Sequence, residues 1–156
     1  MMKTYDQLVK DCLEHVQEVF PWDLIDEINA GKNILLLDVS EPNEFSRAHI
    51  PDSLNVPRGI LESACEYDYD ETVPQLAGGR SNDIVVICRS GRRSALAADT
   101  LLQMGFSKVR SLKTGLRGWN DGEYPLVDDQ QQPVDPDLAE EYYTTKLRPD
   151  QKKPTG

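Results

Sequence analysis

The stretch that decides the fold is Ile84–Ala97, with the sequence IVVICRSGRRSALA. Its first four residues form an unbroken apolar run, which is typical of a strand that is covered on both faces. A short loop follows Cys88, and a helical pattern of apolar residues extends from Ser94 to Met104, where Gly105 ends it. A buried strand that leads through a tight loop into a helix is the repeating unit of a parallel α/β sheet.

Other parts of the chain repeat this alternation of strand and helix patterns. A second strong apolar run covers residues 33–39, and weaker ones cover 53–56 and 108–112. Pro21 and Gly31 bound a helical pattern over 22–30, since proline suits a first helical turn and glycine a helix end. We therefore predict an α/β domain with a mainly parallel sheet.

The two ends of the chain look peripheral to this domain. Residues 1–20 are predicted to form an amphipathic helix, which a Thr-x-x-Gln capping box opens at Thr4. Residues 21–127 form the predicted domain, interrupted by an acidic surface connection over 62–82. Residues 128–156 are an acidic extension rich in Pro and Gln, with one short helix over 136–144 and a disordered end.

Composition excludes several classes of function. The 156 residues include 27 Asp and Glu against 17 Lys and Arg, so the net charge is −10. Phosphate contacts need a basic face, which argues against a nucleic-acid partner. No apolar run approaches the roughly 18 residues of a membrane span, and the first residues do not resemble a secretory signal. We expect a cytoplasmic protein with no membrane partner.

The three cysteines, Cys12, Cys65 and Cys88, fit neither a disulfide scaffold nor a structural zinc site. Their number is odd and no Cys-x-x-Cys pair occurs, while His15 and His49 are the only histidines. We therefore predict no metal site. Cys12 lies on the apolar stripe of the first predicted helix and is expected in the core.

Cys88 stands in a different setting, because the carboxyl ends of parallel strands are where ligands bind. A tight loop that enters a helix turns its backbone N–H groups toward one point and can hold an anion. Such donors and adjacent cations stabilise a thiolate, so we predict that Cys88 is an ionised nucleophile at neutral pH. The predicted anion-binding residues are Arg89, Ser90, Gly91, Arg92, Arg93 and Ser94.

A cysteine at the end of a buried strand is in most proteins a small inert hydrophobe. Burial does not explain three arginines and a glycine in the next five positions, so the functional interpretation of Cys88 is preferred. Cys65 lies beside Glu62 and Glu66, which disfavour a thiolate. A role for Cys65 as a resolving thiol is the minor alternative.

Three sequence blocks resemble single-domain rhodaneses, the thiosulfate sulfurtransferases. The first block is LDVSEPNEF with AHIPDSLNVP over residues 37–57, the second is the Cys88 loop, and the third runs from Gly105 to Trp119. Together they extend over about Trp22 to Pro125. The resemblance implies a five-stranded, mainly parallel sheet with helices on both faces and no metal or organic cofactor.

The resemblance also implies the chemistry. Cys88 matches the nucleophile that forms a persulfide, the amides of 89–94 match the anion cradle, and Arg93 matches its last, often basic, position. The donor is expected to be thiosulfate or a persulfide. The expected acceptor is a small thiol such as glutathione, cyanide or a thioredoxin-like protein.

Two departures from the family pattern concern positions that support the fold. Ser40 replaces the arginine of Asp-Val-Arg, and AHIPD over 48–52 replaces Gly-His-Ile-Pro-Gly. Asp38 and His49 are accordingly interpreted as structural. The N-terminal helix is expected either to cover the core or to pair with a second subunit in a homodimer.

Two other functions compete with sulfur transfer. Phosphatases and arsenate reductases of this fold need an arginine six positions after the cysteine, and here Ser94 occupies that place while Arg93 is one residue short. The other alternative is a rhodanese-like binding module without catalysis. Such a module has no reason to keep the cysteine, the glycine and the arginines together.

Overall fold

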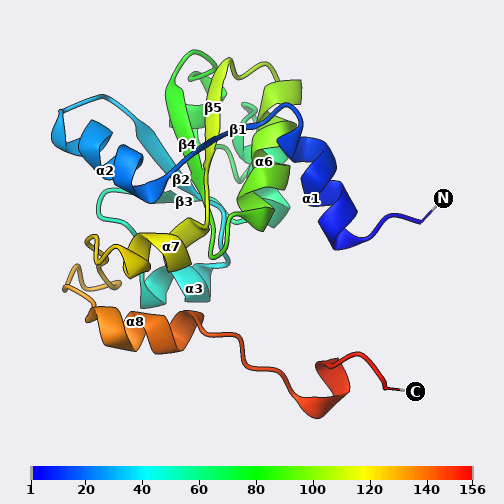
Figure 1. The fold of residues 1–156 in the computed structure, drawn as a ribbon. Helices are drawn as coiled ribbons and strands as arrows, with labels where there is room; N and C mark the ends of the chain where they lie inside the picture. The colour runs from blue at the N-terminus through cyan, green and yellow to red at the C-terminus, as the bar shows by residue number, and fades with distance from the viewer. Residues whose placement is uncertain (1, 156) are drawn as a thin grey trace.

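A five-stranded sheet with helices on both faces forms the core of the computed structural model, which describes residues 2–155 (Figure 1). The strand order is β1-β5-β4-β2-β3, and every neighbouring pair is parallel. The predicted α/β class with a mainly parallel sheet is confirmed. The strands are β1 (Gln17–Val19), β2 (Leu35–Asp38), β3 (Leu54–Asn55), β4 (Asp83–Ile87) and β5 (Lys108–Leu112).

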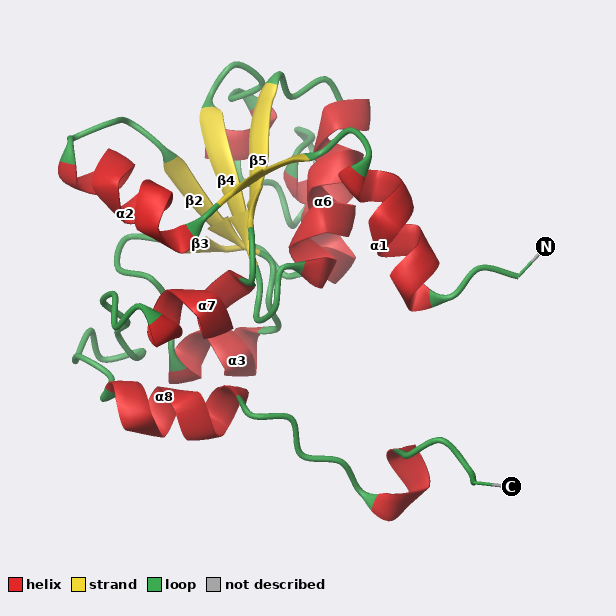
Figure 2. Ribbon diagram, viewed as in Figure 1, coloured by secondary structure: helices red, strands yellow, loops and turns green. Residues whose placement is uncertain are grey.

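The helices cover both faces of the sheet, with α1 and α6 on one face and α2 and α7 on the other (Figure 2). On the first face α4 packs against α6, and on the second face α8 packs against α7 on the side away from the sheet. Within residues 2–155, no helix has the length and apolar character needed to cross a membrane. The helices are α1 (Tyr5–Leu13), α2 (Pro21–Asn29), α3 (Pro42–Arg47), α4 (Leu61–Ala64), α5 (Pro74–Ala77), α6 (Arg92–Gln103), α7 (Gly115–Asp121) and α8 (Pro136–Tyr143).

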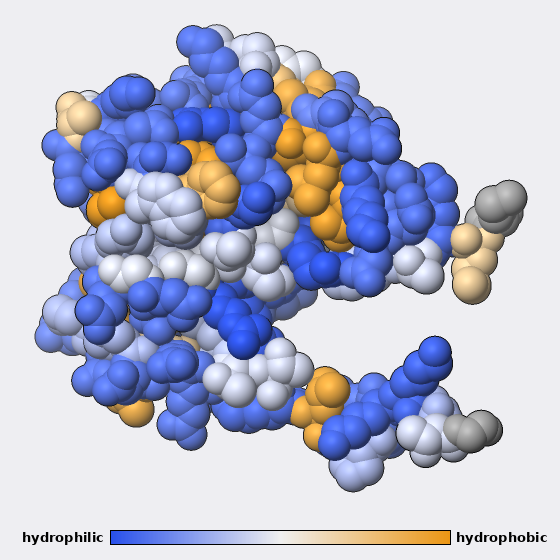
Figure 3. Space-filling view, viewed as in Figure 1, coloured by the Kyte–Doolittle hydropathy of each residue, from blue (hydrophilic) through white to orange (hydrophobic). Residues whose placement is uncertain are grey.

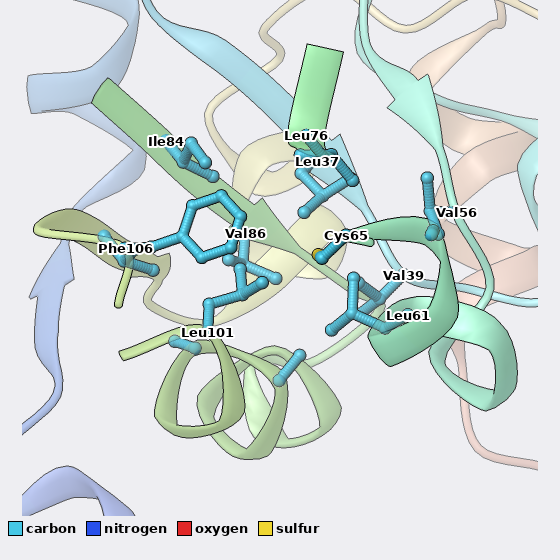
Figure 4. Packing of buried hydrophobic residues seen from close by; sticks show 14 of the residues in the cluster. Leu37, Val39, Val56, Leu61, Cys65, Leu76, Ile84, Val86, Leu101 and Phe106 are labelled. Atoms are coloured by element: carbon cyan, nitrogen blue, oxygen red, sulfur yellow. The ribbon is translucent and has the colours of Figure 1, made fainter. Parts of the chain in front are cut away.

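Alternation of side chains along β4 fills a separate core on each face of the sheet. Ile84, Val86 and Cys88 belong to the core beneath α6, whereas Val85 and Ile87 belong to the opposite core. Cys88 continues this alternation, so its side chain lies on the same face as α6. Figure 4 shows the α6-side core, where the β4 side chains meet Leu37, Cys65, Leu101 and Phe106.

The predicted helix over residues 1–20 is wrong in its second half, because α1 ends at Leu13. Residues 17–19 instead form the edge strand β1, which pairs with Arg110–Leu112 of β5. Val16, just before β1, packs in the α6-side core, and Val19 of β1 packs in the opposite one. The apolar positions here are at helical spacing, but backbone hydrogen bonds to β5 make residues 17–19 a strand instead of a helix. α1 itself packs against α6; pairing with a second subunit stays a prediction.

The connection over residues 62–82 is only partly a surface loop. Residues 66–71 are exposed, but α4 and α5 interrupt the segment, and Cys65 and Leu76 are fully buried in the α6-side core. Cys65 is thus a core residue and not, as the acidic surroundings suggested, part of a solvated loop.

The C-terminal extension returns to the domain through α8. The predicted short helix is confirmed, and it packs against α7 with Ala139 and Tyr143 buried. A 3-10 turn at Pro149–Gln151 follows. The predicted disorder of the last residues stays a prediction, and Gly156 lies outside the described residues.

Candidate active site

Cys88 follows β4 at the carboxyl end of the sheet and is fully buried. Its Sγ accepts hydrogen bonds from the backbone N–H groups of Gly91 and Ser94, each at 3.2 Å. The Cys88 thiol donates to the Ser94 hydroxyl oxygen at 3.3 Å, and this hydroxyl lies 2.7 Å from the Ser111 hydroxyl. Donors that converge on a sulfur atom stabilise its thiolate form. Two of the residues predicted to bind an anion, Gly91 and Ser94, thus direct their amides at the Cys88 sulfur, and the binding of an anionic ligand there stays a prediction.

Gly91 shapes the loop that carries these donors. Its φ of 86° lies in the left-handed region, and it is the N-cap of α6, which begins at Arg92, slightly earlier than predicted. A Cβ at this position would lie 3.1 Å from both the Leu112 carbonyl oxygen and the Thr114 amide nitrogen. A glycine is therefore needed both for the backbone conformation and for the close approach of β5.

The first turn of α7 holds the Cys88 loop through backbone hydrogen bonds, and the sequence did not predict this contact. The N–H groups of Leu116 and Arg117 donate to the carbonyl oxygens of Cys88 and Arg89, at 2.9 and 3.0 Å. Gly115 makes this approach possible, because a Cβ there would lie 2.6 Å from the Arg89 carbonyl carbon and oxygen. In the sequence, this contact was indicated only by Gly115, which belongs to the third of the blocks that resemble rhodaneses.

Arg93 does not point at the sulfur but forms an ion pair with Glu44 of α3. Two hydrogen bonds join the guanidinium and the carboxylate, at 2.8 and 3.0 Å. The hydrogen bond to Glu44 raises the pKa of Arg93, and the nearby Cys88 acts in the same direction. Arg93 thus lies within electrostatic reach of Cys88, although its charge is balanced by Glu44.

The other two loop arginines are held by segments from the two ends of the chain. Arg92 pairs with Asp6 of α1, and its guanidinium lies 4.6 Å from the centre of the Tyr5 ring. Arg89 donates to the Tyr143 carbonyl oxygen of α8 at 2.7 Å. In the space-filling view, the surface is hollowed between α1 and the chain that follows α8 (Figure 3).

The expectation that guanidinium groups converge with the amides on Cys88 is therefore corrected. The sulfur takes its hydrogen bonds from Gly91 and Ser94, whereas Arg89, Arg92 and Arg93 turn to other partners. The physical reason is that Asp6, Glu44 and the Tyr143 carbonyl oxygen lie within reach of these long side chains and pair with their charge. Ser90, the remaining member of the predicted cradle, is exposed.

Asp38 and His49 lie near the site in supporting positions. His49 is buried, bonds through Nδ1 to the Phe45 carbonyl oxygen at 2.8 Å and stacks on the Phe45 ring. Asp38 Oδ1 accepts from the Ser40 N–H at 2.9 Å. Burial raises the pKa of Asp38 to about 6. Among the described residues, Asp38 Oδ2, the Ser40 hydroxyl and the Tyr143 hydroxyl are buried without a hydrogen-bond partner.

The other two cysteines are core residues. Cys12 and Cys65 are buried, and all three cysteines are free thiols. Burial raises the pKa of Cys65 to about 11, so desolvation, more than the acidic neighbours considered above, opposes a thiolate there. Figure 4 shows its sulfur among Leu37, Val39 and Leu61. Nowhere in residues 2–155 do three His, Cys, Asp or Glu side chains gather as a metal site would require.

Solved structures share this fold. A protein of unknown function from Rhodopseudomonas palustris, named a possible tyrosine phosphatase, matches with a TM-score of 0.73 and 24% identity, over 80% of this chain and 95% of that one. A rhodanese-related protein from Thermoplasma volcanium matches with a TM-score of 0.58 and 28% identity, over 71% and 97%. The first likeness is evidence of a common fold alone.

Related sequences carry names from sulfur metabolism. A sulfurtransferase of Allochromatium vinosum is 29% identical over 72% of this chain and 95% of its own length. A putative mitochondrial thiosulfate sulfurtransferase of Schizosaccharomyces pombe and a putative sulfur carrier protein of Bacillus subtilis are each 33% identical over 93 residues. The match spans 66% and 45% of these two proteins. The names support sulfur transfer in general.

The sequence pattern of the rhodanese-like domain matches residues 21–121, well over half of the chain. The matched region contains the strands β2, β3, β4 and β5, the Cys88 loop and α7, whereas β1 precedes it. The helices α1 and α8, which hold Arg92 and Arg89, lie outside it. The chain belongs to the family of rhodanese-like domains.

Proposed function

We propose that this protein transfers a sulfane sulfur from thiosulfate, or from another persulfide donor, to a thiophilic acceptor through a persulfide on Cys88. The observation that carries the proposal is the pair of N–H groups, from Gly91 and Ser94, that point at a free thiol at the end of a buried strand. Such a site stabilises a thiolate without a neighbouring base.

The reaction takes place in two displacements at sulfur. The Cys88 thiolate attacks the outer sulfur of thiosulfate, a new S–S bond forms, and the old one breaks with its electron pair leaving on sulfite. An acceptor thiolate then attacks the outer sulfur of the Cys88 persulfide, and the Cys88 thiolate departs. No external oxidant or reductant is needed. The Gly91 and Ser94 amides stabilise the same anionic sulfur before and after each cycle.

Mass spectrometry of the intact protein tests the covalent step. After incubation with thiosulfate, we expect a gain of about 32 Da, one sulfur atom, localised to Cys88. Cys88→Ser abolishes both the gain and sulfur transfer, whereas Cys12→Ala and Cys65→Ala retain them. A Cys88→Ser protein as active as wild type, or an unmodified Cys88, overturns the proposal. The unmodified result supports the binding-module alternative.

The phosphatase alternative has less support in the site. The position that a phosphoryl-binding arginine would occupy is Ser94, whose amide and hydroxyl contact the Cys88 sulfur, and Arg93 is engaged by Glu44. No free guanidinium therefore stands at that position to form two hydrogen bonds with a phosphoryl group. Turnover of a small aryl phosphate at a rate comparable to thiosulfate would reverse this ranking.

A further inference from the structure

The C-terminal extension places a basic groove beside the active-site loop. The groove has a volume of about 610 Å³ and is lined by three basic residues together with Leu138, Glu141, Tyr142 and Thr144. The cations are Arg47 of α3, Arg89 of the loop and Lys146, which follows α8. Because Arg89 directly follows Cys88, the groove begins at the loop that carries the nucleophile.

The direct hydrogen-bond and ring partners of the three cations of this groove are uncharged. Arg89 donates to a backbone carbonyl of α8, Lys146 donates to the Glu141 carbonyl oxygen at 2.7 Å, and the Arg47 guanidinium lies 4.9 Å from the centre of the Tyr142 ring. Within residues 2–155, none of the three forms an ion pair with a carboxylate side chain. In a chain of net charge −10, such a group is a local excess of positive charge.

We propose that this groove binds the carboxylate groups of an organic thiol that accepts sulfur from Cys88; the inference rests on the function proposed above. Guanidinium and ammonium groups from separate elements can each hold one carboxylate. The volume is that of a site for a small organic ligand, and a bare inorganic anion would leave most of it to water. The groove borders the active-site loop at Arg89, so a thiol held there by its carboxylates lies beside the residue that follows Cys88.

The transfer step stays balanced with such an acceptor. Its thiolate attacks the outer sulfur of the Cys88 persulfide, the acceptor leaves as a persulfide anion, and Cys88 regains its thiolate. The carboxylates take no part in bond changes. Their binding lowers the KM of the acceptor, because the cations hold the thiol at the loop in a productive orientation.

A series of thiols that differ in carboxylate number tests this inference. We compare 2-mercaptoethanol, 3-mercaptopropionate and mercaptosuccinate, which carry none, one and two, as acceptors for wild type, Lys146→Ala, Lys146→Glu and Arg47→Ala. Each alanine variant is expected to raise the KM of the anionic thiols about two- to fivefold, the Lys146→Glu variant more, and that of 2-mercaptoethanol not at all. Lys108→Ala, at the opposite end of β5, is the matched control and changes none of them.

The outcomes separate this inference from the proposed function. If the variants change the KM of charged and neutral thiols equally, or change neither, the groove does not bind the acceptor's carboxylates, and the proposed sulfur transfer is unaffected. A rise in the KM of thiosulfate alone assigns the groove to the donor and also overturns the inference. If no acceptor supports turnover, binding is measured instead by amide NMR, with the Cys88→Ser protein titrated with mercaptosuccinate. Chemical-shift changes at Tyr142 and Lys146 that become smaller when Lys146→Ala is added support the groove. The absence of such changes refutes it.

Discussion

The guanidinium of Arg93 and the carboxylate of Glu44 are joined by two hydrogen bonds, of 2.8 and 3.0 Å, beside the loop of Cys88. This pair balances the charge of Arg93, whose pKa is raised by the hydrogen bond to Glu44 and also by the nearby Cys88. An anionic donor that approaches Cys88 meets a neutral pair instead of a free cation.

Glu44→Gln is therefore expected to improve the use of an anionic donor. The amide keeps the capping bond to the Glu41 N–H, which Glu44 now accepts at 2.8 Å, but leaves Arg93 with its full charge. We expect the KM for thiosulfate to fall about two- to fivefold, and Arg93→Ala to raise it. Initial rates against thiosulfate concentration measure both, with Glu62→Gln, an exposed partner of Arg58, as control. A higher KM in Glu44→Gln would contradict the argument.

Ser94→Ala tests the contribution of the hydroxyl to the thiolate. It removes the hydroxyl that accepts from the Cys88 thiol at 3.3 Å and that turns its O–H to the sulfur once the thiol ionises, but it keeps the backbone N–H that donates to Sγ at 3.2 Å. One hydrogen bond to a charged group corresponds to about 1.5–3 kcal/mol, so the rate of persulfide formation should fall about tenfold or more. Quenched samples analysed by mass spectrometry give this rate, with the exposed Ser107→Ala as control. An unchanged rate would show that the amides alone stabilise the sulfur.

Gly115→Ala tests the support of the loop by α7. Gly115 has a φ of 62°, and a Cβ would collide with the backbone of Cys88 and Arg89. We expect a loss of about 2 kcal/mol in the free energy of unfolding and at least a tenfold loss of sulfur transfer, because the loop must move. Urea unfolding and initial rates measure the two effects. Gly59→Ala, where a Cβ has nothing within 4 Å, should leave both unchanged.

Asp38 makes the stability of the fold depend on pH. Burial raises its pKa from 3.8 to about 6, so the folded protein binds this proton more tightly than the unfolded chain does. The cost of burying the ionised form of Asp38 is absent well below pH 3.8, grows as pH rises toward 6 and is complete above it. Two pKa units correspond to about 3 kcal/mol.

Asp38→Asn should remove this pH dependence. Relative to wild type, its free energy of unfolding should shift upward by about 2–3 kcal/mol between pH 4 and pH 7.5. Denaturant unfolding of both proteins at the two pH values measures the shift, and other titrating groups cancel in the comparison. The same difference between variant and wild type at both values would contradict the raised pKa of Asp38.

The sequence alone determined the strand, loop and helix around Cys88 and the class of the fold. These features depend on residues close together in the chain: the apolar run of β4, the glycine that permits the turn, and the helical spacing of α6. The same local patterns indicated α2 and α8 to within one or two residues. Local backbone preference and side-chain burial act over short spans, so a single sequence is enough to show them.

Only the tertiary structure decided what surrounds the loop. Arg92 and Arg93 lie next to each other in the chain but pair with Asp6 and Glu44, and residues 17–19 become a strand because β5 offers its edge. These choices depend on groups that are distant in sequence and meet only when the sheet is assembled. Ion pairs and strand pairs form between groups that are close in space, and the spacing of residues along the chain does not show which groups these are.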